Sequence, residues 1–85
     1  MPRILVVDDH PLTRDALAKL LDQGGFDVVG QAGDGHEAIE QARRLQPNLV
    51  LLDLSMPELD GLSALPRLRE AAPDCEVVVL TASGT

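Results

Sequence analysis

Asp53 is a carboxylate that stands where a short apolar run, Leu49 to Leu52, gives way to turn residues. Four apolar residues are too few for a core helix, and their place between turn residues predicts a buried parallel strand. In an open α/β sheet, ligands bind at the carboxyl ends of such strands. Asp53 is therefore the first candidate for a reactive group. The alternative that it only caps a loop stays open, because Asp is common in turns.

Oxygen donors follow apolar runs at two other places in the chain. Asp8 and Asp9 directly follow a run near the start, and Thr81 directly follows a run near the end. Parallel strands present their carboxyl ends at one edge of a sheet, so these groups converge with Asp53 if their strands are neighbours. Carboxylates brought together repel one another unless a cation joins them. Mg²⁺ is the natural partner, because it takes a few carboxylates and keeps several waters.

Such a site suits phosphoryl transfer. A carboxylate beside bound Mg²⁺ can attack a phosphoryl group and form an aspartyl phosphate. The metal offsets the charge of the transferring group, and a hydroxyl such as that of Thr81 can donate a hydrogen bond to its oxygens. Ca²⁺ in a dedicated loop is a poorer match, since the spacing of an EF-hand loop does not occur.

Strands and helices alternate along the chain in the order that builds a parallel sheet. Apolar runs predict four strands, and apolar residues at helical spacing between glycine and proline breakers predict three helices. The expected strands are Ile4–Val7, Phe26–Ala32, Leu49–Leu52 and Glu76–Leu80, and the helices run from Pro11 to before Gly24, from Gly35 to before Pro47 and from Gly61 to before Pro73. This alternation implies right-handed crossovers and helices on both faces of the sheet.

The helical spacing also predicts which side chains face the core. In the first helix the expected inward residues are Leu12, Ala16, Leu17, Leu20 and Leu21, with Arg14, Asp15, Lys19 and Asp22 on the other face. Pro66 predicts a kink or a late start in the third helix, because proline in a helix interior costs about 3 kcal/mol.

Composition limits the classes of function. Eighty-five residues make at most one domain, and the formal net charge is −7. The longest basic cluster is Arg43–Arg44, which is too small for a nucleic-acid interface. No apolar run approaches the length needed to span a membrane, and a leader segment is not expected. The single cysteine, Cys75, suits a reducing compartment, so a cytoplasmic domain is expected.

Three segments together resemble the receiver domain of two-component response regulators, most closely the NarL/LuxR type. They read VVDD at 6–9, LLDLSMPELDG at 51–61 and VVVLTA at 77–82, and the resemblance extends over all 85 residues. It implies a flavodoxin-like α/β fold, a three-layer sandwich around a parallel sheet in the order 2-1-3-4-5. It also implies phosphorylation by a histidine kinase that normally controls a transcriptional output, and no enzyme activity on an outside substrate.

The resemblance assigns a role to each matching residue. Asp53 corresponds to the phosphoacceptor and Thr81 to the switch hydroxyl, while Ala82 keeps access to the phosphoacceptor open. Asp8 and Asp9 correspond to ligands of Mg²⁺. Asp53 and the backbone carbonyl of Ser55 complete that set of ligands.

The sequence departs from the family at its carboxyl end. A family receiver continues through a fourth helix, a fifth strand and a fifth helix, and a lysine at the end of the fifth strand contacts the phosphoryl group. Here the chain stops at Thr85 and the only lysine is Lys19, in the first helix. We therefore expect residues 1–85 to be a truncated receiver without an output domain. An exposed fourth strand would then favour homo-oligomers through residues 76–80.

Two other functions are open at this point. A phosphorylation-independent interaction or oligomerisation module could use the same scaffold. A phosphohydrolase with an aspartate nucleophile fits less well, because many of these enzymes carry a second acid two residues later, where this chain has Ser55. His10 and His36 have no companions at metal-ligand spacing, which predicts solvated side chains outside any site.

Overall fold

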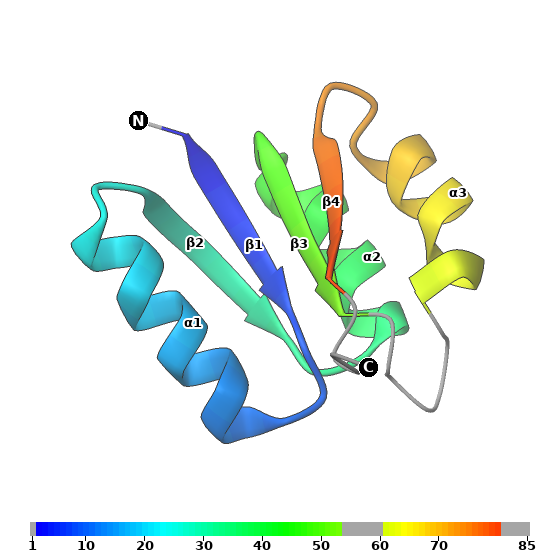
Figure 1. Cartoon of the computed structure of the whole chain (residues 1–85). Helices are drawn as coiled ribbons and strands as arrows, with labels where there is room; N and C mark the ends of the chain where they lie inside the picture. Colours follow the sequence, from blue (N-terminus) through cyan, green and yellow to red (C-terminus); the bar gives the residue numbers. More distant parts are fainter. Residues whose placement is uncertain (1, 54–60, 81–85) are drawn as a thin grey trace.

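Four parallel strands form the centre of the molecule in a computed structural model that describes residues 2–53 and 61–80 (Figure 1). The strands are β1 (Arg3–Val7), β2 (Asp27–Ala32), β3 (Leu49–Asp53) and β4 (Glu76–Leu80). Their spatial order is β2-β1-β3-β4. This is the strand order of a flavodoxin-like sheet, so the expected fold class is confirmed.

Three helices cover the two faces of this sheet. They are α1 (Pro11–Gln23), α2 (Gly35–Leu45) and α3 (Gly61–Ala71). In Figure 1, α1 lies on one face, and α2 lies on the opposite face with α3 beside it. Among the described residues, no helix is long and apolar enough to cross a membrane.

The core lies between the sheet and the α2–α3 layer and is aliphatic. It is built from residues of every strand and helix except α1 and β4, namely Leu5, Val7, Ala32, Ala38, Ile39, Ala42, Val50, Leu52, Ala64, Leu68 and Ala72, with Val77 of β4 packed against it. Gly30 of β2 lets α2 come close, because a Cβ atom there would lie 2.5 Å from Gln41 Oε1 and 2.8 Å from Leu45 Cδ1. The close packing fixes α2 over β1 and β2.

The ends of the helices follow the expected signals. Pro11 occupies the first turn of α1, where its missing N–H is not needed. Asp34 caps α2 by accepting a hydrogen bond from the backbone N–H of Glu37 at 2.8 Å. After Leu45 the chain turns at Gln46, which has a left-handed φ of 48°, and Pro47 follows.

The predicted inward face of α1 is partly wrong. Leu12 and Leu20 are exposed, with 87% and 65% of their surfaces accessible, whereas Ala18 is buried. Arg14, expected outside, is half-buried because its guanidinium donates hydrogen bonds to groups at the end of the sheet. The side of α1 that carries Leu12 and Leu20 therefore faces solvent.

Of the two alternatives predicted for α3, a kink or a late start at Pro66, the late start is wrong and the kink stays a prediction. The helix begins at Gly61 and continues past Pro66, which lies inside it. A proline removes one backbone donor from the helix. Ala64 and Leu68 flank it and are fully buried, so the packing of this face against the core offsets the lost hydrogen bond.

Cys75, in the turn before β4, is partly buried, as a small structural residue would be. Burial raises the pKa of its thiol, and the nearby positive charge of Arg69 lowers it by a smaller amount. The thiolate is therefore scarce at neutral pH, which makes Cys75 a poor nucleophile.

β4 lies at one edge of the described sheet and leaves apolar side chains accessible. Val78, Val79 and Leu80 are each between 37% and 41% exposed. Unpaired apolar strands of this kind are templates for pairing with another chain. Self-association through β4 stays a prediction.

Candidate functional site

Two buried carboxylates lie side by side at the carboxyl edge of the sheet. β1 and β3 are paired in parallel with Val7 opposite Leu52, which places Asp8 and Asp53 at the next position of each strand. Asp8 is 4% exposed and Asp53 is 5% exposed. Carboxylates are rarely this buried unless other groups pair with them. The two acids therefore mark this edge of the sheet as a candidate functional site.

Hydrogen bonds hold Asp8 in place from three sides. Its backbone N–H donates to the carbonyl of Ala32 at 3.0 Å, and its Oδ1 accepts from the backbone N–H of His10 at 2.9 Å. Arg14 Nη1 donates to the carbonyl of Asp8 at 3.1 Å, while Arg14 Nε donates to Gln31 Oε1 at 3.3 Å. Arg14 is thus a positioning residue that ties α1 to the loop after β1.

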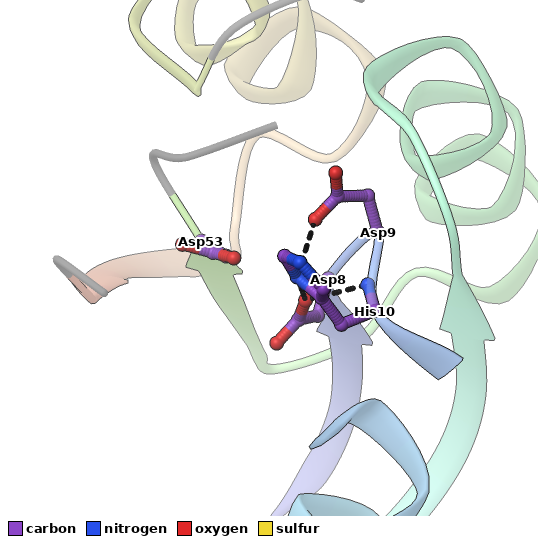
Figure 2. Close-up of side chains that lie close together, drawn as sticks. All are labelled: Asp8, Asp9, His10 and Asp53. Atoms are coloured by element: carbon purple, nitrogen blue, oxygen red, sulfur yellow. Dashed lines mark hydrogen bonds and ion pairs between the residues drawn. The ribbon is translucent and has the colours of Figure 1, made fainter. Parts of the chain in front are cut away.

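Four side chains form a cluster at this edge (Figure 2). Asp8, Asp9, His10 and Asp53 each offer one ligand atom, and these atoms all lie within 4.8 Å of one another. Asp9 Oδ1 is buried and receives no hydrogen bond of good geometry from the described residues, although His10 Nδ1 lies 2.9 Å away. A buried carboxylate oxygen that accepts no hydrogen bond is suited to binding a cation.

His10 is the member of the cluster that the sequence reasoning missed. Its side chain is 66% exposed, as expected, but it also lies within reach of the acids, which its spacing in the sequence did not indicate. Nδ1 lies 2.9 Å from Asp9 Oδ1 and 3.4 Å from Asp8 Oδ1. The signal was present in the sequence, because His10 directly follows the two acids in the loop that opens α1.

Three of the predicted site residues lie outside the described residues. They are Ser55, Thr81 and Ala82. The roles that the family resemblance assigns to them stay predictions. Lys19 is described and lies away from the cluster, on the exposed surface of α1, where its Nζ pairs with Asp15 Oδ2 at 3.2 Å.

A cavity of about 280 Å³ opens beside the cluster on the α1 face of the sheet. It is lined by the two buried acids, Asp8 and Asp53. The other lining side chains are apolar or weakly polar, namely Val7, Thr13, Leu17, Leu51 and Leu80. Apolar walls lower the local dielectric constant and so strengthen the interactions of the carboxylates with a cation.

The cluster fits a hard divalent cation. It offers three carboxylates, two of them buried, and a divalent charge would offset their mutual repulsion. The ligand atoms are mostly oxygens, which Mg²⁺ prefers, and a site with few protein ligands leaves room for the waters that this ion retains.

The fold and the cluster together define a flavodoxin-like α/β domain that gathers carboxylates at the carboxyl edge of a parallel sheet. The chain belongs to the response regulator receiver domain family, whose sequence profile matches residues 4–85. The response regulator GacA of Pseudomonas viridiflava is 46% identical over 82 residues, which make up 95% of this chain and 38% of GacA. The chain thus spans well under half the length of that relative.

Solved structures show the same likeness. A two-component response regulator of the LuxR family from Aurantimonas sp. SI85-9A1 matches with a TM-score of 0.88 and 32% identity, covering 95% of this chain and 59% of that one. The response regulator TrrA of Thermotoga maritima, crystallised in complex with Mg(2+)-BeF, matches with a TM-score of 0.88 and 36% identity. The match covers 99% of this chain and 72% of that one. The resemblance to receiver domains is confirmed.

Proposed function

We propose that this chain is the phosphoacceptor receiver of a two-component response regulator, phosphorylated on Asp53 in a Mg²⁺-dependent reaction. The observation that carries the proposal is the buried Asp53 carboxylate within 4.8 Å of the other ligand atoms of the cluster. TrrA, which matches nearly the whole chain, was crystallised with Mg²⁺ and a beryllium fluoride, which supports a metal at the same edge.

Asp8, Asp9 and Asp53 would hold the Mg²⁺ ion, together with the backbone carbonyl of Ser55. When bound, the ion supplies positive charge beside the transferring phosphoryl group. Asp8 is kept in position by the hydrogen bonds of its loop and of Arg14. Thr81 would donate its hydroxyl to a phosphoryl oxygen, and Ala82 would leave the approach open.

The covalent step is a transfer between two nucleophiles. An oxygen of the Asp53 carboxylate forms a bond to phosphorus, and the bond from phosphorus to the imidazole nitrogen of a phosphohistidine breaks. The leaving imidazole keeps the electron pair of that bond and takes up a proton. With acetyl phosphate as the donor, the same step releases acetate. Asp53 must therefore be ionised and reachable from the cavity side of the sheet.

The partners follow from this chemistry. A histidine kinase would supply the phosphoryl group, and a response-regulator output domain would convert the phosphorylated state into control of transcription. The domain would act as a switch in the cytoplasm, with no substrate of its own, no direct contact with nucleic acid and no membrane insertion. We further propose that residues 1–85 act as the receiver part of such a regulator.

A second candidate is an interaction module that needs no phosphorylation. The half-exposed side chains of Val78, Val79 and Leu80 on β4 favour it, because they offer an apolar edge to another copy of the chain. The two functions differ in one observable. The module predicts that the folded chain gains no phosphoryl group under any condition.

Intact-mass spectrometry of the chain with acetyl phosphate separates the two candidates. We expect the gain of one phosphoryl group in the presence of Mg²⁺ and none after chelation with EDTA, because the metal is needed to offset the charge of the transferring group. Circular dichroism on the same samples checks that the chain stays folded. A folded chain that gains nothing with Mg²⁺ would contradict the proposed function and favour the interaction module.

A further inference from the structure

The imidazole of His10 lies directly over the acid pair of the cluster. Its Nδ1 is 2.9 Å from Asp9 Oδ1 and 3.4 Å from Asp8 Oδ1. Asp9 Oδ1 nevertheless receives no hydrogen bond of good geometry from the described residues. The nitrogen and this buried oxygen therefore face each other at the short range of an ion pair (Figure 2).

These separations suit an ion pair, and they also suit two atoms that share one metal ion. Ligands at about 2.1 Å from a metal lie about 3.0 Å apart at right angles and about 3.4 Å apart at tetrahedral angles. Both distances from His10 Nδ1 are close to this range. Asp53 offers a further oxygen within 4.8 Å of the other ligand atoms. The four side chains thus offer a nitrogen and three oxygens to one ion.

We propose that His10 Nδ1 is an additional metal ligand, which extends the site from Mg²⁺ to divalent transition-metal ions such as Ni²⁺, Co²⁺ and Zn²⁺. The inference rests on the proposed function, because the same carboxylates hold either kind of ion. Imidazole suits these borderline ions, whereas Mg²⁺ takes oxygen ligands and retains water. His10 therefore sets the selectivity of the site.

The exposure of His10 agrees with this role. With 66% of its side chain accessible, the ring can move over the acids without disturbing the core. The backbone N–H of His10 donates to Asp8 Oδ1, which keeps the residue attached to the site whichever ion is bound. The ring can therefore bind a transition-metal ion and stand aside for the waters of Mg²⁺.

Isothermal titration calorimetry of the untagged chain with NiCl₂ and with MgCl₂ tests this assignment. We expect His10→Ala to lower the Ni²⁺ affinity by at least about tenfold, in line with the loss of a metal-supporting group. The affinity for Mg²⁺ should change far less, so the ratio of the two affinities falls. The matched control is His36→Ala, which removes the other histidine, exposed on α2, and should leave the ratio unchanged.

A direct readout of ligation comes from the nitrogen NMR signals of the two histidine rings. Zn²⁺ is diamagnetic, so only a ring that binds it should shift strongly. We expect the Nδ1 signal of His10 to move on addition of Zn²⁺, while both ring nitrogens of His36 stay in place. A Zn²⁺-induced shift at His36 alone, or at neither ring, would overturn the assignment.

The outcomes separate this inference from the proposed function. Mg²⁺ binding that is lost in Asp9→Asn, with an unchanged Ni²⁺ affinity in His10→Ala, would overturn the role of His10 and leave the phosphoacceptor proposal standing. A rise in the affinity for both ions in His10→Ala would also overturn it, because the imidazole would then be a cation that competes with the metal. Failure of the wild-type chain to bind Mg²⁺ would contradict the proposed function itself.

Discussion

Replacing Asp53 with asparagine is expected to abolish phosphorylation of the chain by acetyl phosphate. The amide has nearly the same shape as the carboxylate, so β3 and its pairing with β1 should persist. It lacks the charge and the nucleophilic oxygen that attack phosphorus, and it removes one of the three carboxylates of the cluster. Intact-mass spectrometry in the presence of Mg²⁺ should therefore show the unmodified mass alone.

The control for this substitution is Asp74→Asn, which removes one carboxylate from an exposed turn before β4. It gives the same change in net charge without touching the cluster, so its phosphorylation should match that of the wild type. Equal phosphoryl gain by Asp53→Asn and Asp74→Asn would mean that another group accepts phosphorus. Asp8 and Asp9 would then be the next residues to replace.

Replacing Leu68 with alanine is expected to lower the free energy of unfolding by about 2–5 kcal/mol, because it opens a cavity in the core. Leu68 is fully buried on the face of α3 that packs against the sheet and α2. A chain of 85 residues has about 4–13 kcal/mol of stability in total, so this single change can remove a large share of it. Urea denaturation followed by circular dichroism measures the loss.

Leu12→Ala is the matched control, since it makes the same chemical change in another helix. Leu12 is 87% exposed, and substitutions at such positions change stability by about 0.5 kcal/mol or less. A loss at Leu12 as large as that at Leu68 would contradict the burial that the structure assigns to α1 and α3.

The sequence was sufficient to predict the strands, because the signals there are local and agree with one another. The apolar runs and the glycine and proline breakers indicate the same elements, and the strand order follows from the family resemblance. Placing Asp8 beside Asp53 needed that strand order, which makes β1 and β3 neighbours, and the rule that parallel strands end at one edge.

Predictions failed where tertiary contacts outweigh local pattern. Helical spacing alone placed Arg14 on the solvent-facing side of α1, but its hydrogen bonds to the carbonyl of Asp8 and to Gln31 draw its side chain inward. Pro66 was expected to kink or delay α3, yet the helix begins at Gly61 without delay, because the burial of Leu68 beside the proline favours it. The approach of His10 to the acids depends on the loop after β1, whose geometry no periodicity encodes.

The most direct test of the central claim is to locate the phosphoryl group by chemistry. The chain is treated with acetyl phosphate and Mg²⁺ and then reduced with borohydride, which converts an aspartyl phosphate to homoserine. Peptide mass spectrometry then identifies the modified residue. The proposed function predicts homoserine at position 53 and at no other aspartate. Homoserine at position 8 or 9, or none in a folded chain, would contradict it.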